Sequence, residues 1–167
     1  IEENIIMNTN VLKKCHEYNT DRVISVLSSC IYPDVVKNYP MKEDELFNGP
    51  PPKENFAYAM SKRCMATQID SYKKQYNRDW SYLVPCNLYG EHDKYEEHHS
   101  HFVSALIKKI KEATDSVEIW GTGKPLRQFI YYKIGEIFIS FTNYFRPKGP
   151  FYLKKTIIKS YPFTIFR

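Results

Sequence analysis

Apolar and polar positions along the chain follow first a helical period and then a strand-like one. Apolar side chains recur at helical spacing over residues 4–18 and stop at Asn19-Thr20-Asp21, which predicts a helix that ends there. Residues 22–27 then read R-V-I-S-V-L, a short β-branched run that is typical of a buried strand in a parallel sheet. A helix that leads into such a strand is the repeating unit of an α/β fold.

The same alternation continues further along the chain. Prolines at five positions keep residues 32–54 from forming a regular helix, so this segment is predicted to be mostly loop. The pattern then predicts a helix over 55–76, a strand over 80–86, a polar loop over 87–100, a helix over 101–114 and a short strand over 117–120. Helices that alternate with apolar strands imply right-handed crossovers, and hence an α/β fold with a partial, Rossmann-like, doubly wound parallel sheet.

Composition indicates one folded domain followed by a distinct tail. At 167 residues and 43% hydrophobic content, the chain is long and apolar enough to bury one sizeable core. Its formal charge of +5 comes from residues 128–167, which hold seven Lys and Arg side chains and one acid, so the rest is nearly neutral. The charge therefore does not indicate nucleic-acid binding by the folded part. We expect an NAD(P)-binding, Rossmann-like domain over residues 1–131 and a divergent basic tail over 132–167 with no assignable domain.

Two further classes of protein are not indicated. The longest apolar stretches are far too short to cross a bilayer, so no membrane partner is predicted. The four cysteines, Cys15, Cys30, Cys64 and Cys86, form neither a Cys-x-x-Cys pair nor the density of a disulfide scaffold. A reducing, cytoplasmic setting is expected.

The clearest chemical pattern joins Ser28, Tyr58 and Lys62. Ser28 follows the predicted strand, and the i, i+4 spacing puts Tyr58 and Lys62 on one face of the long helix. A nearby ammonium favours the phenolate, which makes Tyr58 a proton shuttle near neutral pH, while Ser28 orients a substrate carbonyl. Tyr-x-x-x-Lys is by itself a common chance pairing. Here it lies between two strands whose carboxyl ends are where a doubly wound sheet binds its cofactor.

A histidine cluster offers a different interpretation. His92, His98, His99 and His101 lie within ten residues and together suggest a metal site. Neither a His-Glu-x-x-His pattern nor a pair of thiolates accompanies them, and the adjacent His98 and His99 are poorly placed to bind one ion. A solvated loop without a metal is therefore expected.

Four longer motifs resemble one family of enzymes. They read L-S-S-C-I-Y-P at 27–33, N-F-A-Y-A-M-S-K at 55–62, P-C-N-L-Y-G-E-H-D at 85–93 and W-G-T-G-K-P-L-R-Q-F at 120–129. In order and spacing they resemble the GDP-L-fucose synthases of the extended short-chain dehydrogenase/reductase family, over residues 4–131. That family converts GDP-4-keto-6-deoxy-D-mannose to GDP-L-fucose by epimerising C3 and C5 and then reducing C4 with NADPH.

The resemblance implies a role for each matching side chain. Ser28, Tyr58 and Lys62 correspond to the reductase triad, in which Tyr58 donates a proton to the carbonyl oxygen as hydride arrives. Cys30 and His101 correspond to the pair that epimerises the carbons beside the ketone, where an enolate delocalises the charge. NADP(H) is the implied cofactor. Its implied contacts are Tyr58, Lys62, Pro85, Cys86, Asn87, Leu88 and His101, and those of the GDP-sugar substrate are Lys109, Trp120 and Arg127.

The chain also departs from the family's pattern. Cys86 stands where the family has Thr, and none of the six glycines forms the glycine-rich turn that binds the NADP pyrophosphate. An acidic pair that follows the fourth motif in the family is replaced by Tyr131-Tyr132-Lys133. We therefore expect the middle portion of such an enzyme, lacking the first strands and most of the substrate domain. The unusual tail suggests a misread intron, a frameshift or a degenerate gene.

Three other interpretations stay open. Another nucleotide-sugar epimerase or dehydratase of the same superfamily would share Tyr58 and Lys62 without requiring Cys30 and His101. A non-catalytic interaction module would pair with an intact subunit and bind no NADPH, whereas a homodimer is the assembly that the resemblance implies. Nucleic-acid binding through the tail has little support, because seven scattered cations form no organised face.

Overall fold

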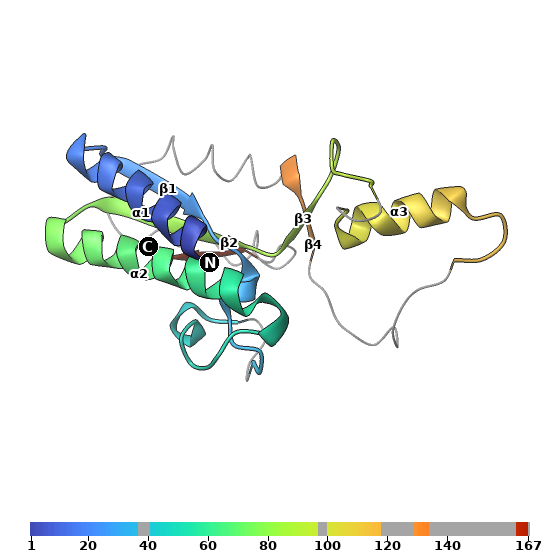
Figure 1. Ribbon diagram of the computed structural model, residues 1–167, viewed down its shortest axis with the longest axis horizontal. Helices are drawn as coiled ribbons and strands as arrows, with labels where there is room; N and C mark the ends of the chain where they lie inside the picture. Colours follow the sequence, from blue (N-terminus) through green and yellow to red (C-terminus); the bar gives the residue numbers. More distant parts are fainter. Residues whose placement is uncertain (37–40, 97–99, 118–128, 134–162, 167) are drawn as a thin grey trace, which may run out of the picture. The chain divides into compact units, whose positions relative to one another are not determined.

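The computed structural model describes residues 1–36, 41–96, 100–117, 129–133 and 163–166 (Figure 1). These residues fall into two compact units, which are described separately. The first contains Ile1–Cys86 together with the last strand, and the second begins at Asn87. The predicted division of the chain near residue 131 stays a prediction.

Helices and parallel strands make up the first unit. In chain order they are α1 (Glu2–Glu17), β1 (Arg22–Val26), η1 (Ser29–Ile31), η2 (Glu43–Glu45), η3 (Lys53–Asn55), α2 (Phe56–Tyr76), β2 (Asp79–Pro85) and β5 (Phe163–Phe166). The two helices and two strands predicted from periodicity are confirmed, with ends that move by at most two residues. The described part of the proline-rich segment holds only single turns of 3-10 helix, as its prolines predict.

Asparagines in the left-handed conformation end both long helices. Asn77 follows α2 with φ 53°, and Asn19 lies just beyond α1 with φ 51°. Asparagine tolerates this conformation better than most residues and so reverses the chain after a helix. Each helix is therefore followed within a few residues by its strand.

The three-stranded sheet has the order β1-β2-β5. β1 and β2 are parallel, with Val23 opposite Trp80 and Val26 opposite Leu83, which confirms the predicted parallel pairing. β5 pairs antiparallel with β2, so the tail contributes a strand that the sequence did not predict. Because β1 and β2 are parallel, their carboxyl ends meet at one edge, where the chain continues into Ser28 and Cys86.

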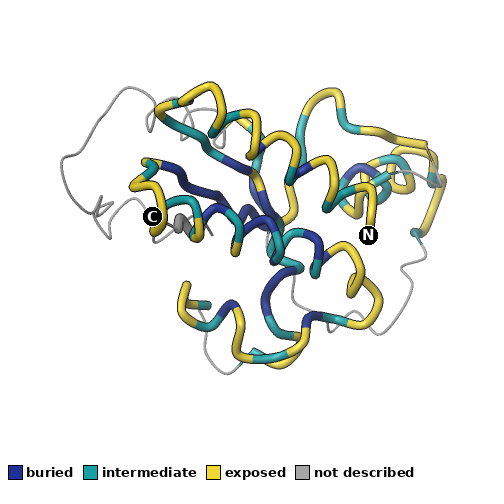
Figure 2. The backbone as a smooth tube through the Cα atoms, turned by 60° about the vertical axis from the view of Figure 1, so that its left-hand side comes forward, coloured by how far each residue is buried: buried dark blue, intermediate teal, exposed yellow. Residues whose placement is uncertain are grey.

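The core of this unit lies between the helices and the sheet. Leu12 of α1, Ile69 of α2 and Trp80 of β2 belong to one buried cluster, and none is more than 1% exposed. α1 and α2 lie side by side (Figure 1), and burial is concentrated along β2 and the inner side of α2 (Figure 2). Each large apolar side chain buried this way contributes about 1.5–3 kcal/mol. The core thus fixes α2 against β2, and with it the predicted tyrosine and lysine.

The second unit contains β3 (Asn87–Tyr89), α3 (Phe102–Glu112) and β4 (Phe129–Tyr131), with β3 and β4 parallel. The helix predicted over 101–114 is confirmed. The prediction that residues 87–100 are entirely loop is wrong at its start, because three residues pair with β4. The strand predicted over 117–120 lies outside the described residues from 118 onward. Within the described part of the chain, no helix is both long and apolar enough to cross a bilayer.

Candidate functional site

Ser28 and Cys30 lie at the carboxyl end of β1. Ser28 has an extended backbone and caps η1, where its Oγ accepts a hydrogen bond of 3.4 Å from the backbone N–H of Cys30. The backbone N–H of Leu27 donates to the Leu83 carbonyl at 2.8 Å, which ties the end of β1 to β2. The turn that carries the serine and the cysteine is therefore anchored to the sheet.

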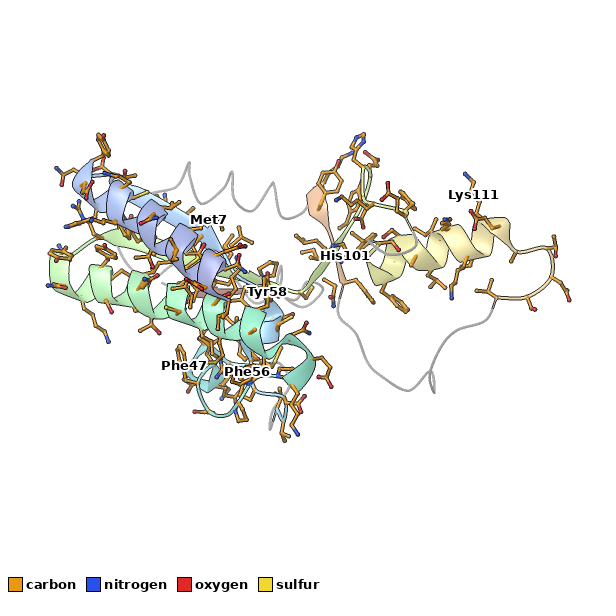
Figure 3. All side chains as sticks on the ribbon, viewed as in Figure 1. Met7, Phe47, Phe56, Tyr58, His101 and Lys111 are labelled. Carbon is orange, nitrogen blue, oxygen red and sulfur yellow. The ribbon has the colours of Figure 1, made fainter. Side chains whose placement is uncertain are left out.

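Tyr58 lies in the first turn of α2 (Figure 3). Burial raises the pKa of Tyr58, the neighbouring Cys30 sulfur raises it further, and a hydrogen bond with the Ser28 side chain lowers it in part. Because Tyr58 is still 41% exposed, it can reach a substrate. The structure thus brings together three of the side chains predicted for chemistry.

Lys62 lies one turn further along α2. Its Nζ is 5.9 Å from the centroid of the Tyr58 ring and donates a hydrogen bond of 3.0 Å to the Val26 carbonyl. Burial lowers the pKa of Lys62. The prediction that this ammonium lowers the pKa of Tyr58 is wrong for this arrangement, because the pKa of Tyr58 is raised by its removal from water.

Pro85 and Cys86 complete the carboxyl end of β2, and both are buried. Burial raises the pKa of the Cys86 thiol, which keeps it protonated and makes it a small apolar contact. Asn87 and Leu88 begin β3 in the second unit, and both are exposed.

The remaining predicted residues lie beyond the first unit. His101 precedes α3, and its backbone carbonyl accepts hydrogen bonds of 2.9 Å from the Ala105 N–H and the Ser104 hydroxyl. The side chains of His101 and Lys109 are exposed. Trp120 and Arg127 lie outside the described residues.

The histidine-rich loop was predicted to be a solvated loop without a metal. In the described ranges, no three His, Cys, Asp or Glu side chains are placed to hold a metal ion. His92 has a left-handed backbone with φ 67°, whereas His98 and His99 fall in the segment 97–99, which is not described.

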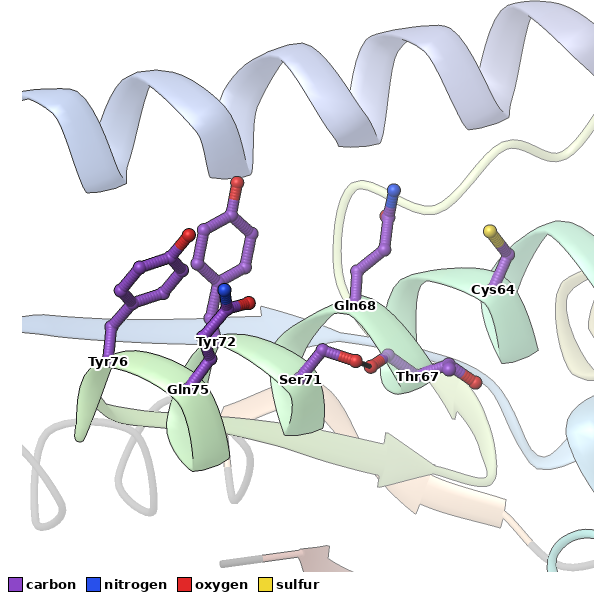
Figure 4. Close-up of a pocket in the computed structure, with 7 residues that line it drawn as sticks. All are labelled: Cys64, Thr67, Gln68, Ser71, Tyr72, Gln75 and Tyr76. Carbon is purple, nitrogen blue, oxygen red and sulfur yellow. Dashed lines mark hydrogen bonds between the residues drawn. The ribbon is translucent and has the colours of Figure 1, made fainter.

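A pocket of about 460 Å³ lies along α2, on the side that faces α1 (Figure 4). Cys64, Gln68, Tyr72 and Tyr76 are among its lining residues. None of the side chains predicted for chemistry lines this pocket. It is therefore separate from the site at the ends of β1 and β2.

Sequence reasoning missed Arg63. This residue is only 7% exposed, and its Nε donates a hydrogen bond of 2.6 Å to the Ile31 carbonyl in η1. The signal was present in the helical pattern, because Arg63 occupies the same buried stripe as Ala59 and Ala66. A charged residue at a core position needs a polar partner, and here the partner adjoins Cys30.

Known proteins resemble the chain over most of its length. The model of the NAD dependent epimerase/dehydratase family matches residues 1–133. A GDP-L-fucose synthase of Dictyostelium discoideum is 39% identical over 155 residues, which are 90% of this chain and 48% of that protein. The GDP-L-fucose synthase of Escherichia coli K12 is 36% identical over 135 residues, which are 78% of this chain and 42% of that protein.

Solved structures give the same result. A GDP-L-fucose synthetase from Naegleria fowleri bound to NADP has a TM-score of 0.74 at 32% identity, covering 84% of this chain and 47% of that one. A GDP-D-glycero-L-gluco-heptose synthase from Campylobacter jejuni, in the presence of NADPH, has a TM-score of 0.76 at 26% identity. The match covers 86% of this chain and 52% of that one. The chain thus spans about half the length of the relatives it matches. With the family model matching most of its residues, the chain belongs to the NAD dependent epimerase/dehydratase family.

Proposed function

We propose that this chain supplies the reactive side chains of a GDP-L-fucose synthase, an NADPH-dependent epimerase and reductase of GDP-4-keto-6-deoxy-D-mannose. The observation that carries the proposal is geometric: Lys62 Nζ lies 5.9 Å from the Tyr58 ring centroid and 3.0 Å from the Val26 carbonyl, which places both side chains of α2 at the strand end that leads to Ser28 and Cys30. Reduction needs the serine, tyrosine and lysine. A cysteine beside these three residues can transfer protons when the configuration of the carbons next to the ketone is also inverted.

In the reductive step, Tyr58 donates its phenolic proton to the oxygen at C4 while Ser28 donates a hydrogen bond to the same oxygen. The raised pKa of Tyr58 keeps the phenol protonated and ready to donate. NADPH, when bound, supplies hydride to C4. Lys62 carries three N–H groups, of which one is used by the Val26 carbonyl, so the ammonium fits the hydroxyls of a nicotinamide ribose.

In the epimerisation step, Cys30 and His101 exchange the protons at C3 and C5. These protons are acidic because the enolate delocalises the negative charge onto the ketone oxygen. Inversion requires that one group removes the proton from one face and another group returns a proton to the opposite face. The step therefore needs two groups but consumes no reductant.

Other residues bind the two ligands in this proposal. Pro85, Cys86, Asn87 and Leu88 would hold the nicotinamide of NADPH, and Lys109, Trp120 and Arg127 would bind the GDP-sugar. Cations suit a pyrophosphate, and an indole offers a flat apolar contact.

Two variants of the protein that carries this chain test the proposal. The unsubstituted protein and each variant are incubated with the ketosugar and NADPH in deuterated water. Both the oxidation of NADPH and the incorporation of deuterium at C3 and C5 are measured. Tyr58→Phe is expected to lose NADPH oxidation and retain deuterium exchange. Cys30→Ser is expected to lose the exchange. The proposal fails if the unsubstituted protein shows neither activity.

Retention of full turnover by Cys30→Ser would instead favour another nucleotide-sugar epimerase or dehydratase of the family. A UDP-N-acetylglucosamine 4-epimerase from Methanobrevibacter ruminantium is a structural relative of this kind, with a TM-score of 0.69 at 28% identity. Exchange at C3 and C5 separates the two, because a 4-epimerase has no need to remove either proton.

We also propose that the protein forms a homodimer and works in the cytoplasm. Apolar Ile6, Met7 and Val11 of α1 are each more than half exposed, and a second copy would cover them. The four free cysteines suit a reducing compartment. Sedimentation equilibrium should give twice the chain mass for the unsubstituted protein and a lower mass for Met7→Glu. A monomer mass for the unsubstituted protein would contradict the proposed homodimer.

A further inference from the structure

Arg63 is a buried cation next to the turn that carries Cys30. Only 7% of it is exposed, its Cζ lies 5.6 Å from the centroid of the Phe47 ring, and its Nε donates to the Ile31 carbonyl at 2.6 Å. Its Nη2 is buried and has no hydrogen-bond partner among the described residues. The strong contact of this side chain is therefore the one that it makes with η1.

The Ile31 carbonyl needs such a donor. Within η1, the Ile31 N–H donates to the Ser28 carbonyl at 3.1 Å and the Tyr32 N–H donates to the Ser29 carbonyl at 3.2 Å. Ile31 is completely buried, so its own carbonyl lies at the end of the turn and away from water. A backbone carbonyl in that position costs free energy unless a donor reaches it. Arg63 provides that donor.

One rigid element consequently holds both reactive groups. α2 carries Tyr58 directly, and through Arg63 it also holds the backbone carbonyl of Ile31, the residue that follows Cys30. At the other end of the turn, the Ser28 side chain accepts from the Cys30 backbone. Cys30 thus lies between two fixed points, and movement at Ile31 would change the distance between the thiol and the phenol.

We propose that Arg63 is a positioning residue for the epimerisation step, which fixes the Cys30 thiol against Tyr58 by holding the Ile31 carbonyl. This inference rests on the proposed function. Arg63 acts through the backbone and touches no substrate. Its loss should therefore slow proton exchange at C3 and C5 more than hydride transfer to C4.

A matched set of variants isolates the hydrogen bond. In glutamine the side-chain nitrogen lies the same number of bonds from Cα as the Nε of arginine, and in methionine a methyl group takes this position. Arg63→Met should slow deuterium exchange by about tenfold or more, as expected for a lost hydrogen bond to a charged donor. Arg63→Gln keeps a donor in place and should restore most of the exchange. KM should be unchanged in both variants.

A second readout does not depend on catalysis. The rate at which iodoacetamide alkylates Cys30 is measured by mass spectrometry, with Cys64 of the same protein as the internal reference. Arg63→Met should change the Cys30 rate relative to the reference, and Arg63→Gln should not. If the unsubstituted protein shows no proton exchange, the proposed function fails, and the alkylation rates alone decide whether Arg63 positions Cys30.

Two outcomes would overturn the inference. One is a folded Arg63→Met protein whose exchange and Cys30 alkylation rates are both unchanged. The other is an equal loss of exchange and hydride transfer that Arg63→Gln does not restore, which indicates a general structural role. Should Arg63→Met not fold, Arg63→Lys decides, because its donor lies one bond further from Cα. Equal rates of deuterium exchange in the unsubstituted protein, Arg63→Gln and Arg63→Lys would then contradict the inference.

Discussion

The Nζ atom of Lys62 lies 3.0 Å from the backbone carbonyl oxygen of Val26 and donates a hydrogen bond to it. Val26 is the last residue of β1 and lies two residues before Ser28. β1 is an edge strand of the sheet, whose order is β1-β2-β5. The bond therefore connects the helix that carries Tyr58 to the strand that leads to Ser28. In addition to its proposed role toward the cofactor, Lys62 holds the two halves of the site together.

Replacing Lys62 should accordingly affect both stability and reaction. Lys62→Met is expected to lower the free energy of unfolding by about 1 kcal/mol, because the Val26 carbonyl loses its donor. It should also slow NADPH oxidation strongly. Lys74→Met, at an exposed position of the same helix, is the control and should change stability by less than about 0.5 kcal/mol. Denaturant unfolding measures the first effect and NADPH oxidation the second; a destabilised variant that reacts normally would limit Lys62 to a structural role.

The pKa of Tyr58 can be measured without any substrate. With tyrosines labelled at Cζ with ¹³C and Tyr58→Phe used for assignment, the phenol of Tyr58 should titrate above its ordinary value of 10.0, since burial raises its pKa. Cys30→Ala should lower this pKa because the neighbouring sulfur raises it. Ser28→Ala should raise it further, since the serine hydrogen bond lowers it. Shifts of opposite sign would contradict the arrangement of the three side chains.

Periodicity in the sequence was sufficient to predict the elements that carry the site. α1 and α2 each bury one face and β2 is buried over nearly its whole length, and such burial leaves a regular apolar pattern. β1 is only partly buried, with Val26 exposed, and its β-branched residues are what indicated a strand. The i, i+4 spacing of Tyr58 and Lys62 likewise predicts their shared helix face, since the helix period is fixed. Chemistry that follows from local geometry was therefore accessible before the structure.

Contacts that depend on tertiary structure were not accessible in this way. The partner of Lys62 is a backbone carbonyl, which every residue carries and which no residue type can reveal. Arg63 has its partner 32 residues away in the chain. β3 is only three residues long, too short for its period to be recognised, and β5 pairs with a strand about eighty residues earlier. The predicted effect of Lys62 on Tyr58 failed for the same reason, because desolvation depends on packing.

Alkaline pH should destabilise the first unit through Tyr82. Burial and the nearby Asp70 raise the pKa of this tyrosine, and its hydroxyl donates a hydrogen bond of 3.2 Å to the Asp70 carboxylate. The unfolded chain therefore loses the Tyr82 proton at lower pH than the folded chain does. This contribution to stability is complete below about pH 10 and is lost as the pH rises above it.

Tyr82→Phe should make the loss of stability above about pH 10 less steep. At neutral pH the same variant should cost about 1 kcal/mol, because Asp70 loses a hydrogen bond. Tyr18→Phe is the control, since Tyr18 is 79% exposed and its hydroxyl contacts water before and after unfolding. Denaturant unfolding across this range is the measurement. If the unsubstituted protein and Tyr82→Phe lose stability in parallel, the buried contact with Asp70 does not govern the pH dependence.

Packing between the helices and β2 can be tested at Ile69. This side chain is fully buried, in the cluster that joins Leu12 of α1 to Trp80 of β2. Ile69→Ala removes three carbons from a filled space and should cost about 2–5 kcal/mol, whereas Ile69→Val removes one and should cost about 0.5–1.5 kcal/mol. Val35→Ala is the surface control, at a position that is 81% exposed and lies outside the proposed dimer contact. Because α2 holds Tyr58, Lys62 and Arg63 in place only while it is packed on β2, Ile69→Ala should also reduce the reaction rate at temperatures where the protein is still folded. A cost near that of the surface control would show that α2 is not held by this core.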